Sequence, residues 1–329
     1  MTSSLNPLLS VENLEVSLRD PAHDRQGWIL RGVDLTLSAG ERLALVGESG
    51  CGKSMTALSI LRLLPQPPME ITGGEIRFKN KNMGLLTESD WRKVRGKEIG
   101  IIFQDPLSSL NPVLRVGDQI AETLLAHLDL SPVEADKKVV GLLKEVGLPD
   151  PERIARQYPH QLSGGMCQRI MIAMAIACGP SLLIADEPTT ALDVTVQTQI
   201  LQLLFRMTEE HGLAVLFITH NLRIVRDYAD RVAILYAGQV VEQGTPGEIF
   251  SHPQHPYTEG LLEALPGFSQ KDRPLFTIGG SVPQPFAPLK GCAFADRCQR
   301  VRENCREDEP RLDEVKKGHQ VRCFYPLKK

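Results

Sequence analysis

The chain has 329 residues, of which 42% are hydrophobic and 23% charged, and this composition excludes a largely disordered protein. Lys and Arg total 37 against 40 for Asp and Glu, so the net charge of -3 and the 5% aromatic content argue against a nucleic-acid partner. The apolar stretches, such as 170–178 and 213–218, are shorter than the roughly 18 residues of a membrane helix. Residues 1–18 lack a signal-peptide pattern, so we expect a cytosolic location.

Apolar runs and helical patterns alternate along most of the chain, which predicts an α/β fold with a mostly parallel sheet. The predicted strands are 41–46, 99–103, 182–185 and 214–219, and the predicted helices are 54–64, 133–146, 194–207 and 257–265. Beyond the last of these helices the sequence becomes rich in Pro and Gly. We therefore place a domain boundary near residue 265.

The segment GESGCGKS, residues 47–54, lies between the first predicted strand and helix, where a phosphate-binding loop belongs. Its glycines allow backbone N–H groups to surround phosphate oxygens, Lys53 can reach the β- and γ-phosphates, and Ser54 can ligate Mg²⁺. A chance match is the alternative, and the strand–helix setting argues against it. The predicted nucleotide contacts are Gly47, Glu48, Ser49, Gly50, Cys51, Gly52, Lys53, Ser54 and Met55.

Two further segments add phosphate and metal chemistry. LLIADE, residues 182–187, is an apolar strand that ends in two carboxylates. We expect Asp186 to ligate Mg²⁺ and Glu187 to polarise the attacking water. LSGGMCQR, residues 162–169, opens an apolar helix whose N–H groups offer a second phosphate site, although a capped, buried helix is the alternative. Together these patterns predict nucleotide hydrolysis.

The order of these motifs resembles that of the ATP-binding cassette (ABC) ATPases. Gln104 in IIFQDP, Asp193 in ALDV and His220 in FITHN are similar to that family's metal-sensing glutamine, D-loop aspartate and switch histidine. The resemblance implies catalytic roles for Glu187, His220, Gln104 and Lys53, and Mg²⁺ ligation by Ser54, Gln104 and Asp186. It also implies a RecA-like parallel core, an antiparallel β subdomain and a helical subdomain at about 105–178, all within residues 8–265, followed by a cysteine-rich extension at 266–329.

The same resemblance implies that two cassettes dimerise head to tail. Ser163, Gly164 and Gly165 of one cassette would face the γ-phosphate held by the other, with Asp193 nearby. With one cassette and no predicted membrane span, the chain resembles the detached ATPase subunit of a transporter. Such a subunit would lie peripherally on the cytoplasmic face of the inner membrane, and its partners would be two transmembrane permeases, a paralogous cassette and a substrate-binding protein.

Longer segments are similar to the oligopeptide/dipeptide importer ATPases, and most of all to the dipeptide members. They are FQDPLSSLNP at 103–112, YPHQLSGGM at 158–166, ADEPTTALDV at 185–194 and HPQHPYTEGLLEALP at 252–266. The subfamily also includes nickel, opine and antimicrobial-peptide uptake systems. A soluble cassette ATPase acting on ribosomes or DNA, and a regulatory protein, are the competing hypotheses from different functional classes. The sequence departs from the family's pattern at the residue that stacks on the adenine base. Leu18 stands where the family has an aromatic residue, and the nearest aromatic residue is Trp28.

Four of the seven cysteines crowd the last forty residues, at Cys292, Cys298, Cys305 and Cys323. Their gaps do not match the close pairs typical of zinc sites, whereas iron–sulfur ligation by four thiolates tolerates varied spacing. We therefore predict a [4Fe-4S] cluster that folds the tail, with zinc or unrelated structural thiols as alternatives. The charge run at 297–306 is expected to be a solvated face.

Overall fold

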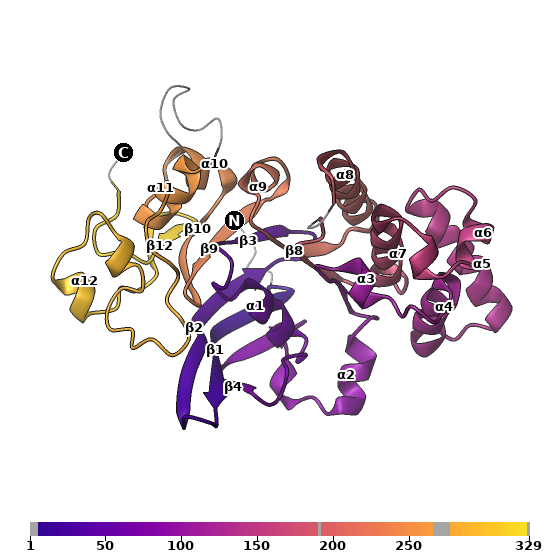
Figure 1. The fold of residues 1–329 in the computed structure, drawn as a ribbon, viewed down its shortest axis with the longest axis horizontal. Coiled ribbons are helices and arrows are strands. Elements are labelled where there is room, and N and C mark those ends of the chain that lie inside the picture. Colours follow the sequence, from indigo (N-terminus) through magenta and orange to yellow (C-terminus); the bar gives the residue numbers. More distant parts are fainter. Residues whose placement is uncertain (1–5, 190–191, 266–276, 328–329) are drawn as a thin grey trace. The chain divides into compact units, whose positions relative to one another are not determined.

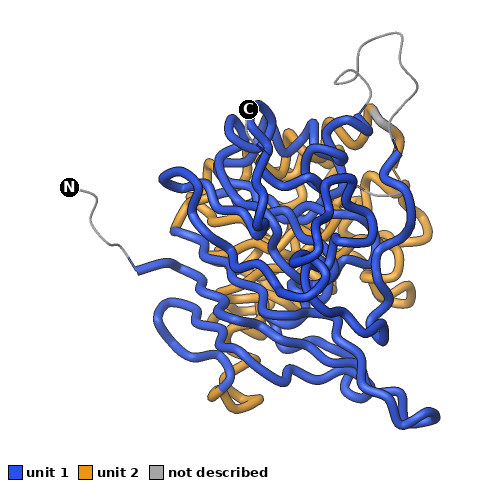
Figure 2. The backbone as a smooth tube through the Cα atoms, turned by 90° about the vertical axis from the view of Figure 1, so that its left-hand side faces the viewer, with its two compact units in different colours: residues 1–38, 42–84, 218–329 blue, residues 39–41, 85–217 orange. Residues whose placement is uncertain are grey.

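The computed structural model describes residues 6–189, 192–265 and 277–327. The chain divides into two compact units, which Figure 2 draws in different colours. Unit 1 comprises Met1–Ser38, Arg42–Gly84 and Ile218–Lys329, and unit 2 comprises Ala39–Glu41 and Leu85–Phe217.

Unit 1 contains an antiparallel sheet with the strand order β2-β1-β4-β5 (Figure 1). Its strands are β1 (Leu9–Asp20), β2 (Arg25–Leu37), β4 (Met69–Phe78) and β5 (Lys81–Asn82). The long β1–β2 hairpin closes at Asp20, whose carboxylate accepts hydrogen bonds from the Ala22 N–H at 3.2 Å and the Arg25 guanidinium at 3.0 Å. Because these bonds stabilise the turn, the hairpin register is fixed at its tip.

The second group of strands in unit 1 has the order β11-β12-β10-β9-β3. Its members are β3 (Arg42–Val46), β9 (Arg231–Tyr236), β10 (Gln239–Gly244), β11 (Asp313–Lys316) and β12 (His319–Val321). β3 runs parallel to β9, and the other pairs are antiparallel. β10 and β12 pair although they lie on opposite sides of the boundary predicted near residue 265. That division of the chain into domains stays a prediction.

The helices of unit 1 are short. They are α1 (Lys53–Ile60), α9 (Leu222–Tyr228), α10 (Pro246–Ser251), α11 (Pro256–Glu263) and α12 (Asn304–Glu307), with 3₁₀ turns at Met83–Leu85 and Ala295–Arg297. α1 stops four residues before the predicted end at residue 64, because Arg62 takes a left-handed conformation with φ of 52° that no helix continues through.

Unit 2 carries the parallel pair β6 (Ile99–Ile102) and β7 (Leu182–Asp186), followed in strand order by β8 (Ala214–Thr219). Helices α2 (Glu88–Val94), α3 (Pro106–Ser109), α4 (Val116–His127), α5 (Pro132–Glu145), α6 (Pro151–Ala155), α7 (Gly164–Ile176) and α8 (Val194–His211) and a 3₁₀ turn at Pro159–Gln161 make up the rest. α5 starts at a capping box in which Ser131 and Glu134 bond each other's backbone N–H groups. The predicted helix at 133–146 agrees with it closely.

The core of unit 1 includes an aromatic cluster from three separate parts of the chain. Tyr236 of β9 and Tyr257 of α11 are fully buried with ring centroids 4.6 Å apart, and Phe294 lies 5.2 Å from Tyr236 and 5.4 Å from Tyr257. Such tilted and edge-on pairs are the favourable aromatic geometries. Through Phe294, the C-terminal region packs into the same core as the strands beside the phosphate loop.

Across the described ranges, every helix falls short of the length and apolar character that a bilayer crossing requires.

Candidate nucleotide-binding site

The loop at residues 47–54 has the backbone conformation of an anion cradle. Gly50 has a φ of 81° and Gly52 a φ of 110°, in the left-handed region that glycine adopts without a steric penalty. At Gly47, a Cβ atom would lie 2.3 Å from the Leu235 carbonyl oxygen, so close packing also requires glycine there. The loop leads directly into α1, whose first N–H groups have no partner within the helix and carry partial positive charge. These features fit a polyphosphate group.

Lys53 is the first residue of α1, and its side chain is buried. Its ammonium group donates to the carbonyl oxygens of Gly47 at 2.9 Å and Glu48 at 3.0 Å, so it reaches back across the loop. The remaining predicted contacts surround it: Ser54 and Met55 are half-buried in α1, Ser49 is exposed, and Cys51 is buried. Burial raises the pKa of the Cys51 thiol, which therefore stays protonated at neutral pH.

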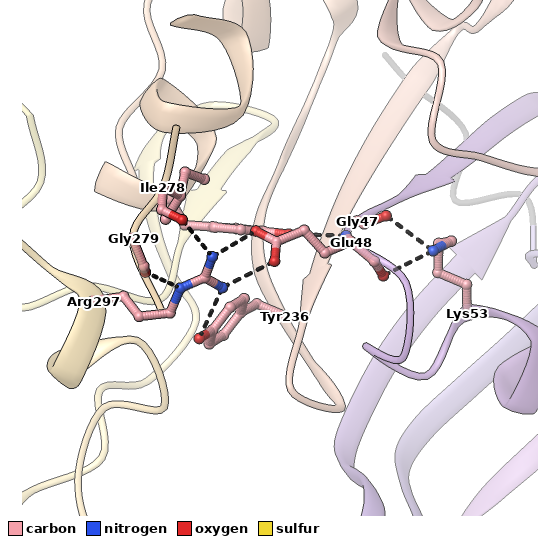
Figure 3. A network of polar contacts seen from close by, with 8 residues as sticks. Gly47, Glu48, Lys53, Tyr236, Ile278, Gly279 and Arg297 are labelled. Carbon is pink, nitrogen blue, oxygen red and sulfur yellow. Dashed lines mark hydrogen bonds and ion pairs between the residues drawn. The ribbon is translucent and has the colours of Figure 1, made fainter. Parts of the chain in front are cut away.

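A buried arginine from the C-terminal region holds the loop at Glu48 (Figure 3). The Arg297 guanidinium donates to both carboxylate oxygens of Glu48, at 3.0 and 3.2 Å. It also donates to the carbonyl oxygens of Gly279 and Ile278 and to the Tyr236 hydroxyl. All five of its N–H donors therefore have partners. Burial alone would lower the pKa of Arg297, but the interactions with Glu48 and Tyr236 together more than offset this effect, and the pKa is raised.

A second contact reaches the same loop residue from α11. The Glu48 backbone N–H donates to the Tyr257 hydroxyl at 3.0 Å, and burial raises the pKa of this tyrosine, so the hydroxyl stays neutral. The sequence interpretation missed both Arg297 and Tyr257. For Arg297 it was wrong about the surroundings, because the side chain is 6% exposed instead of belonging to a solvated face. Its position between Cys292 and Cys298 gives no local sign of a contact 249 residues away.

Unit 2 carries the predicted carboxylates at the end of β7. Asp186 is the last residue of the strand and is buried, and Glu187 follows with a φ of 44°. A left-handed glutamate is uncommon, and such backbone conformations concentrate at functional sites. Within this unit the structure brings Glu187 together with Gln104, whose amide nitrogen donates to Glu187 Oε2 at 3.3 Å.

The residues predicted for the opposite cassette lie at two helix starts of unit 2. Ser163 is the N-cap of α7 and accepts from the Met166 N–H at 3.4 Å. Gly165 packs tightly against α8, since a Cβ there would lie 2.9 Å from Val196. Asp193 caps α8 by accepting the Thr195 and Val196 N–H groups at 3.1 and 3.0 Å. Gly164 has more room, because a Cβ there would lie 3.5 Å from Leu192.

His220 belongs to unit 1, where it is exposed between β8 and α9. The next residue, Asn221, caps α9 through the Arg223 N–H at 3.1 Å. The predicted nucleotide residues are thus divided between the units: residues 47–55 and His220 in unit 1, and Gln104, Asp186, Glu187, Asp193 and 163–165 in unit 2. Their individual roles stay predictions.

The prediction of a metal at the C-terminal cysteines is wrong. Cys292, Cys298, Cys305 and Cys323 do line one pocket, together with apolar side chains such as Phe294 and Phe324. However, within residues 6–189, 192–265 and 277–327 no group of three or more His, Cys, Asp and Glu side chains could hold a metal ion. Burial raises the pKa of Cys292 and of Cys323 to about 11, so without a metal ion both are protonated thiols at neutral pH. Neither a [4Fe-4S] cluster nor zinc fits this arrangement.

Comparison with known families defines the class of protein. Residues 30–190 match the family described as ABC transporter, and residues 241–305 match the oligopeptide/dipeptide transporter C-terminal region. The chain belongs to the ABC transporter ATPases, and its fold is the P-loop fold of that family. The predicted family is therefore confirmed.

Individual relatives cover nearly the whole chain. It is 47% identical to the dipeptide transport ATP-binding protein DppD of Bacillus subtilis, over 97% of this chain and 95% of that protein. It is 48% identical to the oligopeptide transport ATP-binding protein OppD of the same organism, over 96% of this chain and 88% of that protein. Among solved structures, a dimeric ATP-binding cassette, MJ0796 bound to ADP and Pi, is 30% identical with a TM-score of 0.65, over 72% of this chain and 98% of that chain.

Proposed function

We propose that this chain is the ATP-hydrolysing subunit of an ABC importer for dipeptides or oligopeptides. The observation that carries the proposal is the 47% identity to a dipeptide transport ATP-binding protein over 97% of the chain. The loop at 47–54, with its glycines and buried lysine, supplies the ATP-binding chemistry that such a subunit needs. Nickel or opine uptake is less well supported, because the similar proteins named above are dipeptide and oligopeptide transport proteins.

The residues of the site fit ATP and Mg²⁺ by their donor chemistry. Ser54, Gln104 and Asp186 offer hydroxyl, amide and carboxylate oxygens, which are the ligands a hard divalent cation prefers. Bound Mg²⁺ would neutralise charge that develops on the phosphates during hydrolysis. In this proposal Lys53 binds the β- and γ-phosphates, and Glu187 holds and polarises the attacking water.

Gln104 gives Glu187 a defined orientation through the 3.3 Å hydrogen bond between their side chains. We propose that His220 contacts the γ-phosphate, because it matches the family's switch histidine. Both assignments rest on the motif resemblance together with the positions of these residues at strand ends.

A second cassette is the proposed partner for hydrolysis. The similar solved cassette is described as dimeric. In this chain the start of α7 offers backbone N–H groups at Ser163, Gly164 and Gly165, and such a helix start suits a phosphate held by the opposite protomer. We propose a head-to-tail dimer with a paralogous cassette, in which Asp193 lies at the interface.

Membrane attachment would come from two permease subunits, with a substrate-binding protein delivering the peptide. Unit 2 exposes several large apolar side chains within a short stretch of sequence after β6, namely Phe103, Leu107, Val113, Leu114 and Leu125. Exposed apolar groups of this size are typical of protein interaction sites. We propose that this stretch meets the permeases on the cytoplasmic face of the membrane.

Reconstitution with co-purified permeases tests the function. The complex in proteoliposomes should hydrolyse ATP faster when the substrate-binding protein and a dipeptide are added, and a Glu187→Gln complex should not. Stimulation by nickel or an opine, with none by di- or oligopeptides, would overturn the peptide assignment. An ATPase rate that never responds to permeases or substrate would overturn the transporter role.

A further inference from the structure

A pocket of about 540 Å³ lies at one end of the antiparallel sheet of unit 1, where β2, β1 and β4 run side by side (Figure 1). Three parts of the chain line it: the end of β1, the start of β2 with the turn before it, and residues 66–70, which lead into β4. Among the described residues, no member of the phosphate loop belongs to this lining. The volume is within the range of small-molecule binding pockets, and the pocket differs from the candidate nucleotide site.

The register of the sheet places polar lining residues on one face. Ser17 of β1 pairs with Glu70 of β4, and Arg19 of β1 pairs with Gln26 of β2. Because successive side chains of a strand point to opposite faces, Ser17 and Arg19 share a face, and their cross-strand partners share it with them. A guanidinium and a carboxylate therefore border the same pocket from neighbouring strands.

The wall formed by residues 66–70 is held to β1 by its backbone. The Arg19 N–H donates to the Pro68 carbonyl oxygen at 2.9 Å, and the Met69 N–H donates to the Pro65 carbonyl oxygen at 3.1 Å. The rings of Pro67 and Pro68 also restrict the backbone of this segment. Together with Met69, these prolines give the pocket an apolar wall opposite its polar groups.

The charged groups of the lining are not used by the fold itself. Within residues 6–189, 192–265 and 277–327, the side chains of Arg19, Asp24 and Glu70 have no hydrogen-bond or ion-pair partner, and all three are exposed. Arg25 differs from them, because its guanidinium bonds Asp20 at 3.0 Å. A ligand that carries both a negative and a positive group would pair with groups of both signs in this pocket, whereas a purely anionic or cationic ligand would meet a like charge.

The uncharged lining residues favour a ligand with amide groups between its two charges. Gln26 and Gln66 each carry a carboxamide that can donate and accept hydrogen bonds, as a peptide group requires. An exposed pocket of this size also has room for more than a single ion.

We propose that this pocket binds a short peptide with free termini. Arg19 would pair with the C-terminal carboxylate, Glu70 with the N-terminal ammonium, and the carboxamide of Gln26 with a peptide group between them. The lining alone specifies a small zwitterion with hydrogen-bonding groups, and the choice of a peptide rests on the proposed function, since peptides are the proposed cargo of the importer.

Calorimetry on the full chain tests the proposal, with trialanine as the probe. N-acetyl-trialanine lacks the ammonium and trialanine amide lacks the carboxylate, so each should bind about fivefold more weakly, as the loss of one exposed charge pair predicts. Trialanine blocked at both ends should bind more weakly still. Added salt should weaken the binding of free trialanine, because it screens exposed charges.

Substitutions then assign each terminus to a side chain. Arg19→Gln should weaken trialanine binding about fivefold and leave the affinity for trialanine amide unchanged. Glu70→Gln should show the same loss for trialanine and leave the affinity for N-acetyl-trialanine unchanged. Arg77→Gln and Glu12→Gln are the matched controls, because these exposed residues of the same sheet lie outside the pocket. Unchanged ATP binding in every variant shows that unit 1 is folded.

The outcomes separate this inference from the proposed function. If the unmodified chain does not bind trialanine, or binds the free and the doubly blocked peptide equally, the inference fails. Losses in the control variants as large as those in Arg19→Gln and Glu70→Gln would also overturn it, because they would indicate a general effect of charge. A reconstituted complex that peptides stimulate, built from a chain that binds no trialanine, would overturn the inference and leave the proposed function in place. A chain that binds trialanine as described, in a complex that no peptide stimulates, would do the reverse.

Discussion

The phosphate loop, residues 47–54, and the cysteine segment, residues 292–323, lie in the same unit. They differ in whether the backbone or the side chains supply the groups that could bind a ligand. The loop offers backbone N–H groups, and its shape follows from left-handed glycines and tight packing at Gly47. The cysteine segment offers side-chain sulfur atoms, which lie among apolar residues in one pocket. Backbone donors acquire their direction from local conformation, whereas side-chain ligands need correct orientation from distant parts of the fold. A short motif therefore determines the first kind of site and not the second.

The largest expected effect falls on the ATPase reaction. Glu187→Gln should leave ATP binding intact and reduce turnover of the assembled complex at least about a thousandfold, because the neutral amide no longer polarises water. Lys53→Ala should instead weaken ATP binding itself, since it removes the ammonium that neutralises phosphate charge. Calorimetry and phosphate release measure the two effects. Glu210→Gln, an exposed glutamate of the same unit, is the control, and near-normal turnover of Glu187→Gln would contradict the assignment.

Acid should destabilise unit 1 on the side of the cysteine segment. Burial lowers the pKa of His255 from 6.5 to about 4, so the unfolded chain binds a proton that the folded protein excludes. This contribution to the free energy of unfolding is complete above pH 6.5 and is lost as the pH falls towards 4. The loss should reach roughly 3 kcal/mol, which urea unfolding at several pH values measures.

His255→Asn gives the control for the pH effect. His255 Nδ1 caps α11 by accepting the Tyr257 N–H at 3.1 Å, and an asparagine oxygen can accept the same bond without titrating. The variant should therefore fold and show a flatter pH dependence. An unchanged pH profile would show that another group carries the effect.

The thiols of the cysteine segment should react more slowly with alkylating agents in the folded protein than in the unfolded chain. With pKa values raised to about 11, Cys292 and Cys323 carry about a hundredfold less thiolate at pH 8 than a thiol of pKa 9.0. Alkylation in the native protein should be slower by about that factor, as followed at each cysteine by mass spectrometry. Equal rates in the native and urea-unfolded protein would contradict the buried, protonated state.

The sequence allowed correct predictions wherever neighbouring residues decide the structure. The strands β3 and β7 and the helix α5 lie close to their predicted ranges, and apolar runs and helical spacing within a few positions indicate all three. The contact between Arg297 and Glu48 joins residues 249 apart, and no local pattern encodes such a partner. The cysteine gaps were equally uninformative, because spacing alone does not define the directions of four thiols.

Substitution of Arg297 has the smallest expected effect, and it tests most directly whether the phosphate loop and the cysteine segment act together. Arg297→Ala removes five donated hydrogen bonds and leaves the Glu48 carboxylate, which is 28% exposed, without its cation. Lys53 bonds the Glu48 carbonyl oxygen, so a shift of Glu48 also changes the loop that receives phosphate. We expect ATP affinity to fall about tenfold, equivalent to about 1.4 kcal/mol.

A double-mutant cycle with Glu48→Gln separates this positioning effect from a general loss of stability. If Arg297 acts through Glu48, the two substitutions together should weaken ATP binding little more than either alone. Arg297→Lys should recover only part of the affinity, because a lysine cannot bond both carboxylate oxygens in the same planar geometry. Arg300→Ala, an exposed arginine three residues further on, should have no effect. Additive losses in the cycle would mean that Arg297 stabilises the C-terminal region alone, and that the phosphate loop keeps its shape without it.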